Sequence, residues 1–336
     1  MRKSNFELLK IVCILMVITL HYLNPSIGGA LGNVINGSFN YYIIHFIESL
    51  CIVTVNVFII ITGYFSYKKT SIKIAKPLYL FYLSIFYGVI IYFGMLCFSD
   101  LSLNFDSLFA LSKTIFNRWF VIVYIILYFL IPYLNKLINN ISQDNLKKLI
   151  IINTIAFYVI PTIYLTTLLQ DKGYGIVNFV NLYLIGCYIG KYVNKDIPKY
   201  RTILVYLLCA IITTIISCFT SKDAYMYNSI FNLIGSIALF LTFKNLKIRD
   251  YSFINNLSSY AFSTYIIHEN YFLAFYLFNY LFKTNKYYNS PLLLLNLFLT
   301  IFGIYFITII TELIRRIILK KLDNKINSIK YQIEVK

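Results

Sequence analysis

The N-terminal segment of this sequence contains ionisable residues at a spacing that could support chemistry. Lys10 and His21 are eleven residues apart. On an α-helix this spacing amounts to three turns plus about 20°, so both side chains lie on one face, roughly 16 Å apart along the axis. Glu7 comes one turn before Lys10 and can pair with it. The resulting stripe has an ion pair at one end and an imidazole at the other.

Ionisable side chains inside apolar segments are costly and are candidates for functional sites. An imidazole can exchange protons near neutral pH, which makes His21 the first candidate. A structural interpretation is equally open. In that case Lys10 reaches the membrane surface through its flexible stem, and His21 forms a hydrogen bond at the interface.

The sequence has two further histidines. His45 and Glu48, one helical turn apart, could form a proton relay, although a hydrogen bond between helices is the simpler interpretation. His268 follows Tyr265 by three residues, so the two share a helix face. No carboxylate-rich or HxxxH spacing accompanies these histidines, so no metal site is expected.

Arg118 and Trp119, the only tryptophan, stand together at the start of an apolar segment. Tryptophan is enriched at membrane interfaces, where it anchors helices. An arginine next to an aromatic ring could equally contact a substrate. The sequence leaves both interpretations open.

The composition shows which kind of protein positions these groups. Hydrophobic residues make up 59% of the 336 residues and charged residues only 13%, against about 45–50% and 25% in an average globular protein. So few charges could not solvate a soluble domain of this length. The net charge of +17 comes from short basic runs between apolar stretches, which is typical of membrane topology signals and not of nucleic-acid binding.

Ten apolar segments are long enough to be predicted spans of a lipid bilayer. They are continuously apolar, which favours helices over a β-barrel. The sequence therefore predicts an all-α, polytopic integral membrane protein with about ten transmembrane helices, over residues 8–24, 41–63, 78–98, 118–138, 149–168, 177–193, 202–220, 227–244, 259–282 and 291–314.

The basic residues predict the orientation. If the N-terminus is cytoplasmic, 24 of the 30 Lys and Arg residues are cytoplasmic, and those outside are Lys113, Arg118, Lys172, Lys222, Lys283 and Lys286. Both termini are then cytoplasmic, with residues 1–315 as one transmembrane domain and 316–336 as a basic cytoplasmic tail. The first segment also resembles a signal peptide, but we expect it to be retained because it sets the orientation of the others.

Short motifs recur along nearly the whole chain, from about residue 2 to 315. They are the run from Arg2 to Lys10 with His21, Val55-Asn56-Val57-Phe58, Thr62-Gly63-Tyr64-Phe65, Trp119-Phe120, Leu127-Tyr128, Pro132-Tyr133-Leu134-Asn135, Asn181-Leu182-Tyr183-Leu184-Ile185-Gly186 and Thr264-Tyr265-Ile266-Ile267-His268-Glu269. Together they resemble the acyltransferase 3 family of integral-membrane acyltransferases. The resemblance is greatest to stand-alone members from Gram-positive bacteria that acylate surface glycans.

The resemblance implies an O-acyltransferase of the bacterial plasma membrane. Its donor would be cytoplasmic acyl-CoA, most simply acetyl-CoA, and its acceptor a hydroxyl of a cell-surface glycan or a lipid-linked precursor. No metal cofactor is implied. No extracytoplasmic domain follows the last apolar segment, so transfer would be direct to the acceptor or through a separate extracytoplasmic partner protein.

The resemblance also implies roles for individual residues. The family's first-helix motif, an acidic residue, an arginine and a histidine, falls on Glu7, Lys10 and His21. Lys10 is a departure, because lysine offers a point charge in place of the bidentate arginine fork. His21 would act as the base or as an acyl-carrying nucleophile, with His268 orienting it or the substrate. Further expected contacts are Lys68, Lys69, Lys73 and Lys76 for the coenzyme A phosphates, and Arg118, Trp119 and Tyr265 for the substrate.

A transporter or flippase for a lipid-linked sugar or another polar substrate is the alternative function. Many apolar spans and a few buried polar groups suit it equally well. No internal repeat is visible, and the chain has only 13 Gly and 6 Pro with which to break helices. Both observations favour the enzyme over the transporter.

Overall fold

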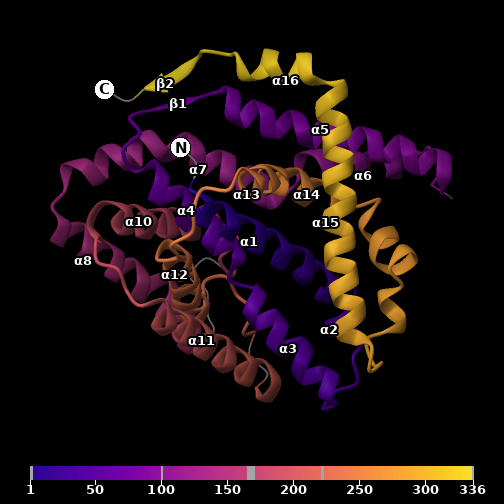
Figure 1. Cartoon of the computed structure of the whole chain (residues 1–336), viewed down its shortest axis with the longest axis horizontal. Coiled ribbons are helices and arrows are strands. Elements are labelled where there is room, and N and C mark those ends of the chain that lie inside the picture. Colours follow the sequence, from indigo (N-terminus) through magenta and orange to yellow (C-terminus); the bar gives the residue numbers. More distant parts are fainter. Residues whose placement is uncertain (1–2, 100, 165–170, 221–222, 335–336) are drawn as a thin grey trace.

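Helix α1 (Ser4–Leu23) runs through the middle of the structure (Figure 1). The structure is a computed structural model, and it describes residues 3–99, 101–164, 171–220 and 223–334. α1 packs against α3 (Phe39–Cys51), α4 (Thr54–Ser66), α12 (Ile230–Lys244) and α15 (Leu293–Ile318). Because helices surround it, α1 is apolar on nearly all sides, as expected of a buried helix.

The remaining described elements are almost all helical. The two strands in this part of the chain, β1 (Ser71–Lys73) and β2 (Gln332–Glu334), form a short antiparallel pair. Single π or 3-10 turns cover Ile155–Val159, Ser258–Tyr260, Tyr276–Leu281 and Thr284–Lys286. The other helices are α2 (Ala30–Asn33), α5 (Ala75–Phe98), α6 (Phe105–Phe116), α7 (Trp119–Asn140), α8 (Gln143–Thr154), α9 (Ile160–Tyr164), α10 (Ile176–Tyr192), α11 (Lys199–Phe219), α13 (Ser252–Leu257), α14 (Ala261–His268) and α16 (Lys320–Asn327).

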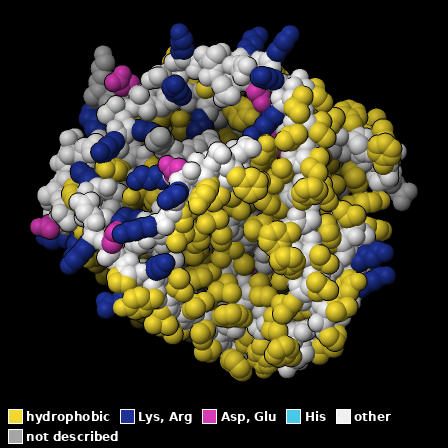
Figure 2. Space-filling model, in the orientation of Figure 1, with side chains coloured by type: hydrophobic (Ala, Val, Ile, Leu, Met, Phe, Trp, Pro, Cys, Tyr) yellow, Lys and Arg dark blue, Asp and Glu magenta, His cyan; other side chains and the backbone are white. Residues whose placement is uncertain are grey.

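Seven helical runs in the described residues are long and apolar enough to cross a membrane, and each overlaps a predicted span. Figure 2 shows a broad hydrophobic surface, with Lys and Arg gathered along its upper and left edges. The chain is therefore an all-α, polytopic membrane protein. The runs are Ser4–Leu23, Phe39–Ser66, Ala75–Phe98, Phe105–Asn140, Gln143–Tyr164, Lys199–Phe219 and Leu293–Ile318.

The other three predicted spans correspond to shorter elements. Segments 177–193 and 227–244 form α10 and α12, of 17 and 15 residues. The continuous helix expected over 259–282 does not form, because α14 already ends at His268. Just beyond it, the Asn270 side chain accepts a hydrogen bond from the backbone N–H of Phe272 at 3.0 Å, a local bond that competes with helix continuation.

Two glycines bring α4 and α10 into backbone contact. A Cβ atom on Gly63 would lie 2.3 Å from the carbonyl oxygen of Tyr183, and one on Gly186 would lie 2.4 Å from that of Ile60. Small residues allow such close approach between helices in membranes. The contact fixes α4, which forms part of the wall of the site described below.

The segment after α15 folds back onto the loop that carries the basic residues. α15 itself continues through Ile318, past the start of the predicted tail at residue 316. Arg315 pairs with Asp323 of α16 at 2.8 Å, and β2 then aligns with β1 so that Ile333 lies opposite Ile72. The predicted tail is thus part of the folded structure.

Ten crossings with both termini in the cytoplasm stay a prediction, which reporter fusions can test. Fusions after Lys148 and after Arg249 should report the cytoplasm, because they follow cytoplasmic basic runs in the predicted map. A fusion near residue 222, which lies outside the described residues, should report the exterior. External signals at both of the first two positions would overturn the map.

Candidate functional site

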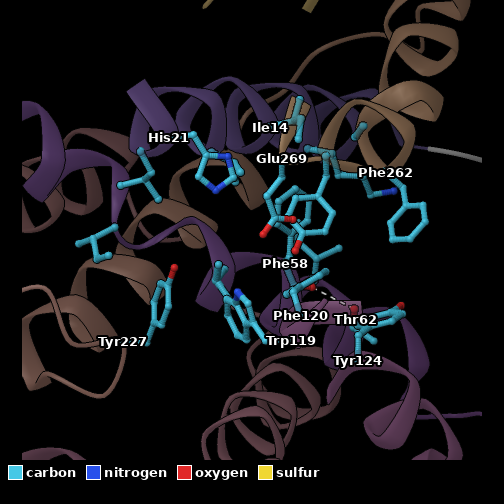
Figure 3. A pocket seen from close by; sticks show the side chains of 18 of the residues that line it. Ile14, His21, Phe58, Thr62, Trp119, Phe120, Tyr124, Tyr227, Phe262 and Glu269 are labelled. Carbon is cyan, nitrogen blue, oxygen red and sulfur yellow. Dashed lines mark hydrogen bonds between the residues drawn. The ribbon is translucent and has the colours of Figure 1, made fainter. Parts of the chain in front are cut away.

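A cavity of about 450 Å³ runs along α1, from Lys10 to Asn24 just beyond the end of the helix. Lys10 and His21 both line it, which confirms that they share a face. The other walls include residues of α3, α4, α5, α7 and α14. Figure 3 shows His21, Trp119, Tyr227 and Glu269 turned toward the same space.

His21 forms a pair with His268. Nδ1 of His21 lies 2.8 Å from Nε2 of His268, and Nδ1 of His268 lies 2.6 Å from the carbonyl oxygen of Thr264. A carbonyl oxygen only accepts hydrogen bonds, so neutral His268 has its proton on Nδ1 and offers Nε2 as an acceptor. His21 must then donate from Nδ1, which leaves its Nε2 without a proton. The pair thus presents a proton-accepting ring to the cavity, with His268 buried behind it.

The predicted ion pair is present toward the start of α1. Nζ of Lys10 lies 2.8 Å from Oε1 of Glu7, and the hydroxyl of Ser258 donates a hydrogen bond to Oε2 of Glu7. Glu7 is buried, whereas 32% of the Lys10 side chain is exposed. Lys10 and Ser258 also line the cavity. The carboxylate therefore holds the ammonium group of Lys10 at the cavity wall.

The four lysines expected to bind the donor fall into two groups. Lys76 lines the cavity, and its Nζ donates to the Tyr124 hydroxyl at 2.9 Å. Lys68, Lys69 and Lys73 are exposed on and around β1. The basic loop thus adjoins the cavity at Lys76.

Arg118 and Glu269 form a buried ion pair. Nη1 of Arg118 lies 3.7 Å from Oε2 of Glu269, and only 5% of the Arg118 side chain is exposed. Trp119, Tyr265 and Glu269 all line the cavity. Arg118 is buried and lines an adjoining cavity, whereas Trp119 lines the main one, and substrate contact by either residue stays a prediction.

The other histidine lies in a separate network. Nδ1 of His45 is 2.8 Å from the Ser217 hydroxyl and 2.7 Å from the Tyr225 hydroxyl. The interpretation of His45 as a partner in a hydrogen bond between helices is confirmed, because Ser217 belongs to α11. Glu48 instead lines the cavity. Within the described residues, no group of three His, Cys, Asp or Glu side chains could hold a metal ion.

Sequence reasoning missed several residues of this cavity. Ser258, Tyr174 and Tyr227 line it but belong to segments with no distinctive motif. Glu48 was visible as a carboxylate in an apolar segment, although its relation to the cavity was not. Glu269 was part of a motif, but its pairing with Arg118 depends on the tertiary fold.

One of the comparisons with known proteins gives a match. Residues 3–312 match the acyltransferase 3 family model, which describes an acyltransferase domain. The match includes α1, the cavity and the His21–His268 pair. No curated protein and no solved structure matches the chain. Because the family model covers most of the sequence, the chain belongs to the acyltransferase 3 family and is an integral-membrane acyltransferase.

Proposed function

We propose that the protein transfers an acyl group, in the simplest case acetyl, from cytoplasmic acyl-CoA to a hydroxyl of a cell-surface glycan or its lipid-linked precursor. The observation that carries this proposal is the single cavity along α1. It is lined by His21, whose Nε2 can accept a proton, and by the basic side chains of Lys10 and Lys76. A base for the acceptor and cations for the donor thus line one cavity.

The reaction follows from the protonation state of His21. Nε2 of His21 takes the proton of the acceptor hydroxyl as its oxygen attacks the thioester carbonyl carbon. The carbon–sulfur bond then breaks, and the departing thiolate receives the proton back from the imidazolium. The same nitrogen could instead attack the thioester and carry the acyl group to the acceptor. Acyl-enzyme formed in a single turnover without acceptor would distinguish this second route.

Mass spectrometry of surface glycans, from cells with and without the gene, tests the function directly. We expect an acyl modification that disappears with the gene and returns with the unmodified protein. Purified protein in vesicles should consume acetyl-CoA only when the acceptor glycan is present. Substrate flux in vesicles free of acyl-CoA, with no acylated product, would instead support the transporter.

The basic loop should determine donor affinity. Replacing Lys68 and Lys73 by glutamine removes two exposed charges that attract the coenzyme A phosphates, so KM for acyl-CoA should rise. The wild-type KM should itself rise with salt, because exposed charges are screened over about 8–10 Å near physiological ionic strength. Steady-state kinetics on correctly inserted protein measure both effects. An unchanged KM would mean that these lysines only set the orientation of the chain.

Lys10 should be essential for transfer. Lys10→Ala removes the ammonium group that Glu7 holds at the cavity wall, and acyl transfer should be lost. Lys10→Arg should retain or increase activity, because it restores the fork that recognises phosphate and carboxylate groups. Product formed per amount of membrane protein is the measurement. Full activity of the alanine variant would exclude a role for Lys10 in the reaction.

A further inference from the structure

We propose that the part of the cavity near Glu48 and Trp119 is a sugar-binding subsite. Glu48 would accept hydrogen bonds from hydroxyls, and the rings of Trp119, Tyr174 and Tyr227 would stack against the sugar. This inference rests on the proposed transfer to a glycan hydroxyl, and it assigns the acceptor to particular residues.

Glu48 is a buried carboxylate at the wall of the cavity. Its side chain comes from α3 and lines the cavity, yet the residue is only 8% exposed. Its Oε2 has no hydrogen-bond partner within the described part of the chain. Buried carboxylate oxygens are almost always hydrogen-bonded in native proteins, so an orphan that faces a cavity indicates a ligand that donates hydrogen bonds.

Three aromatic rings, those of Trp119, Tyr174 and Tyr227, form a wall of the cavity. Trp119 contacts Tyr174 and Tyr227 with ring centroids 4.6 and 5.7 Å away, and the two tyrosines are 4.9 Å apart. Glu48 lines the same cavity as these three rings. Aromatic surface beside a few polar groups suits a ligand with an apolar face and a polar edge. A pyranose ring has this shape.

An aromatic wall with carboxylates could also bind a cation. The surroundings of Arg118 favour a sugar over a cation as the ligand. Nη1 and Nη2 of Arg118 and Oε2 of Glu269 lack hydrogen-bond partners among the described residues. Both residues line an adjoining cavity of about 400 Å³, and Glu269 lines the main cavity as well. A ligand that extends from the main cavity into the adjoining one would therefore both donate hydrogen bonds to the carboxylates and accept them from Arg118. Hydroxyl groups do so, whereas an ammonium group only donates and would be repelled by Arg118.

The chain's only tryptophan lies in this subsite, so its fluorescence reports occupancy. Full-length protein in detergent is titrated, without donor, with glucose, galactose, rhamnose, N-acetylglucosamine and N-acetylmannosamine. At least one sugar should change the Trp119 emission saturably. Glu48→Gln should weaken its binding about tenfold or more, the usual effect of losing a hydrogen bond to a charged group. Asp196→Asn, which changes an exposed carboxylate outside the cavity, is the matched control and should bind normally.

Three results would overturn the inference. They are the absence of a response to any of the five sugars, a response to tetramethylammonium alone, and equal affinity in the Glu48→Gln variant. The titration of unmodified protein tests the idea even if that variant fails to fold. Sugar binding without acyl transfer would refute the proposed function and retain the subsite. Acyl transfer to glycan without any Trp119 response would support the proposed function and refute the subsite.

Discussion

Replacement of His21 by alanine should lower acyl transfer by about 10²–10⁴-fold, the usual contribution of a general base. The variant should reach normal abundance in the membrane, because the ring borders a cavity, although it loses the hydrogen bond to His268. His21→Gln should be nearly as inactive. Glutamine can keep a hydrogen bond to His268, but its amide cannot take a proton near neutral pH. Glycan acylation per amount of membrane protein is the measurement.

His45→Ala is the matched control for His21. It also removes a largely buried histidine with hydrogen-bond partners, but His45 binds Ser217 and Tyr225 outside the cavity. Its variant should retain specific activity even if less protein accumulates. A structural role for His21 would give the opposite pattern, with Gln tolerated and Ala lowering abundance more than specific activity. Full activity of His21→Ala would make His268 the residue to test as the base.

Replacement of His268 by alanine should lower the turnover number strongly while the KM values change little. His268 fixes the tautomer of His21 through the bond between Nδ1 of His21 and its own Nε2. In serine proteases, loss of the group that fixes the catalytic tautomer costs about 10⁴-fold. We expect activity to fall by about 10²-fold or more here, because without His268 the imidazole of His21 can carry its proton on either nitrogen. Steady-state kinetics with both substrates separate this effect from weaker binding.

The glutamine variant distinguishes a positioning role for His268 from a packing role. In His268→Gln the amide oxygen can accept from Nδ1 of His21, and the amide N–H can donate to the carbonyl of Thr264. Activity should therefore recover well above that of the alanine variant. His268→Phe, which fills the volume without these bonds, should not recover. Equal activity of the Phe and Gln variants would mean that His268 only fills space.

Sequence reasoning predicted those residues of the site whose positions follow from the helical repeat within a single helix. Lys10, Glu7 and His21 belong to one helix, and the helical repeat alone places them on one face. The cavity confirms this for Lys10 and His21, and the ion pair with Lys10 confirms it for Glu7. The contact between His21 and His268 joins residues 247 positions apart. No local pattern encodes such a distance. Glu48 remained unassigned for the same reason, because its orphan oxygen is visible only once the cavity has formed.

In the fold, too, local sequence patterns predicted some features, while contacts that no pattern records determined others. Hydropathy located seven long helices, because a span needs about 20 consecutive apolar residues and composition records their length directly. It did not show where an apolar segment stops being helical, as after His268. There the bond from Phe272 to the side chain of Asn270 decides the local backbone. Hydropathy averages over a window and does not register a single competing hydrogen bond.

The pairing of β1 with β2 has a consequence for the order in which the protein is made. The two strands are about 260 residues apart in the chain. At about 5–20 residues per second, the ribosome needs roughly 13–50 s to travel from one to the other. During that interval Ser71–Lys73 has no partner strand, while the intervening helices are synthesised. The loop beside Lys76 is therefore completed only after the roughly 260 residues that separate the two strands have been synthesised.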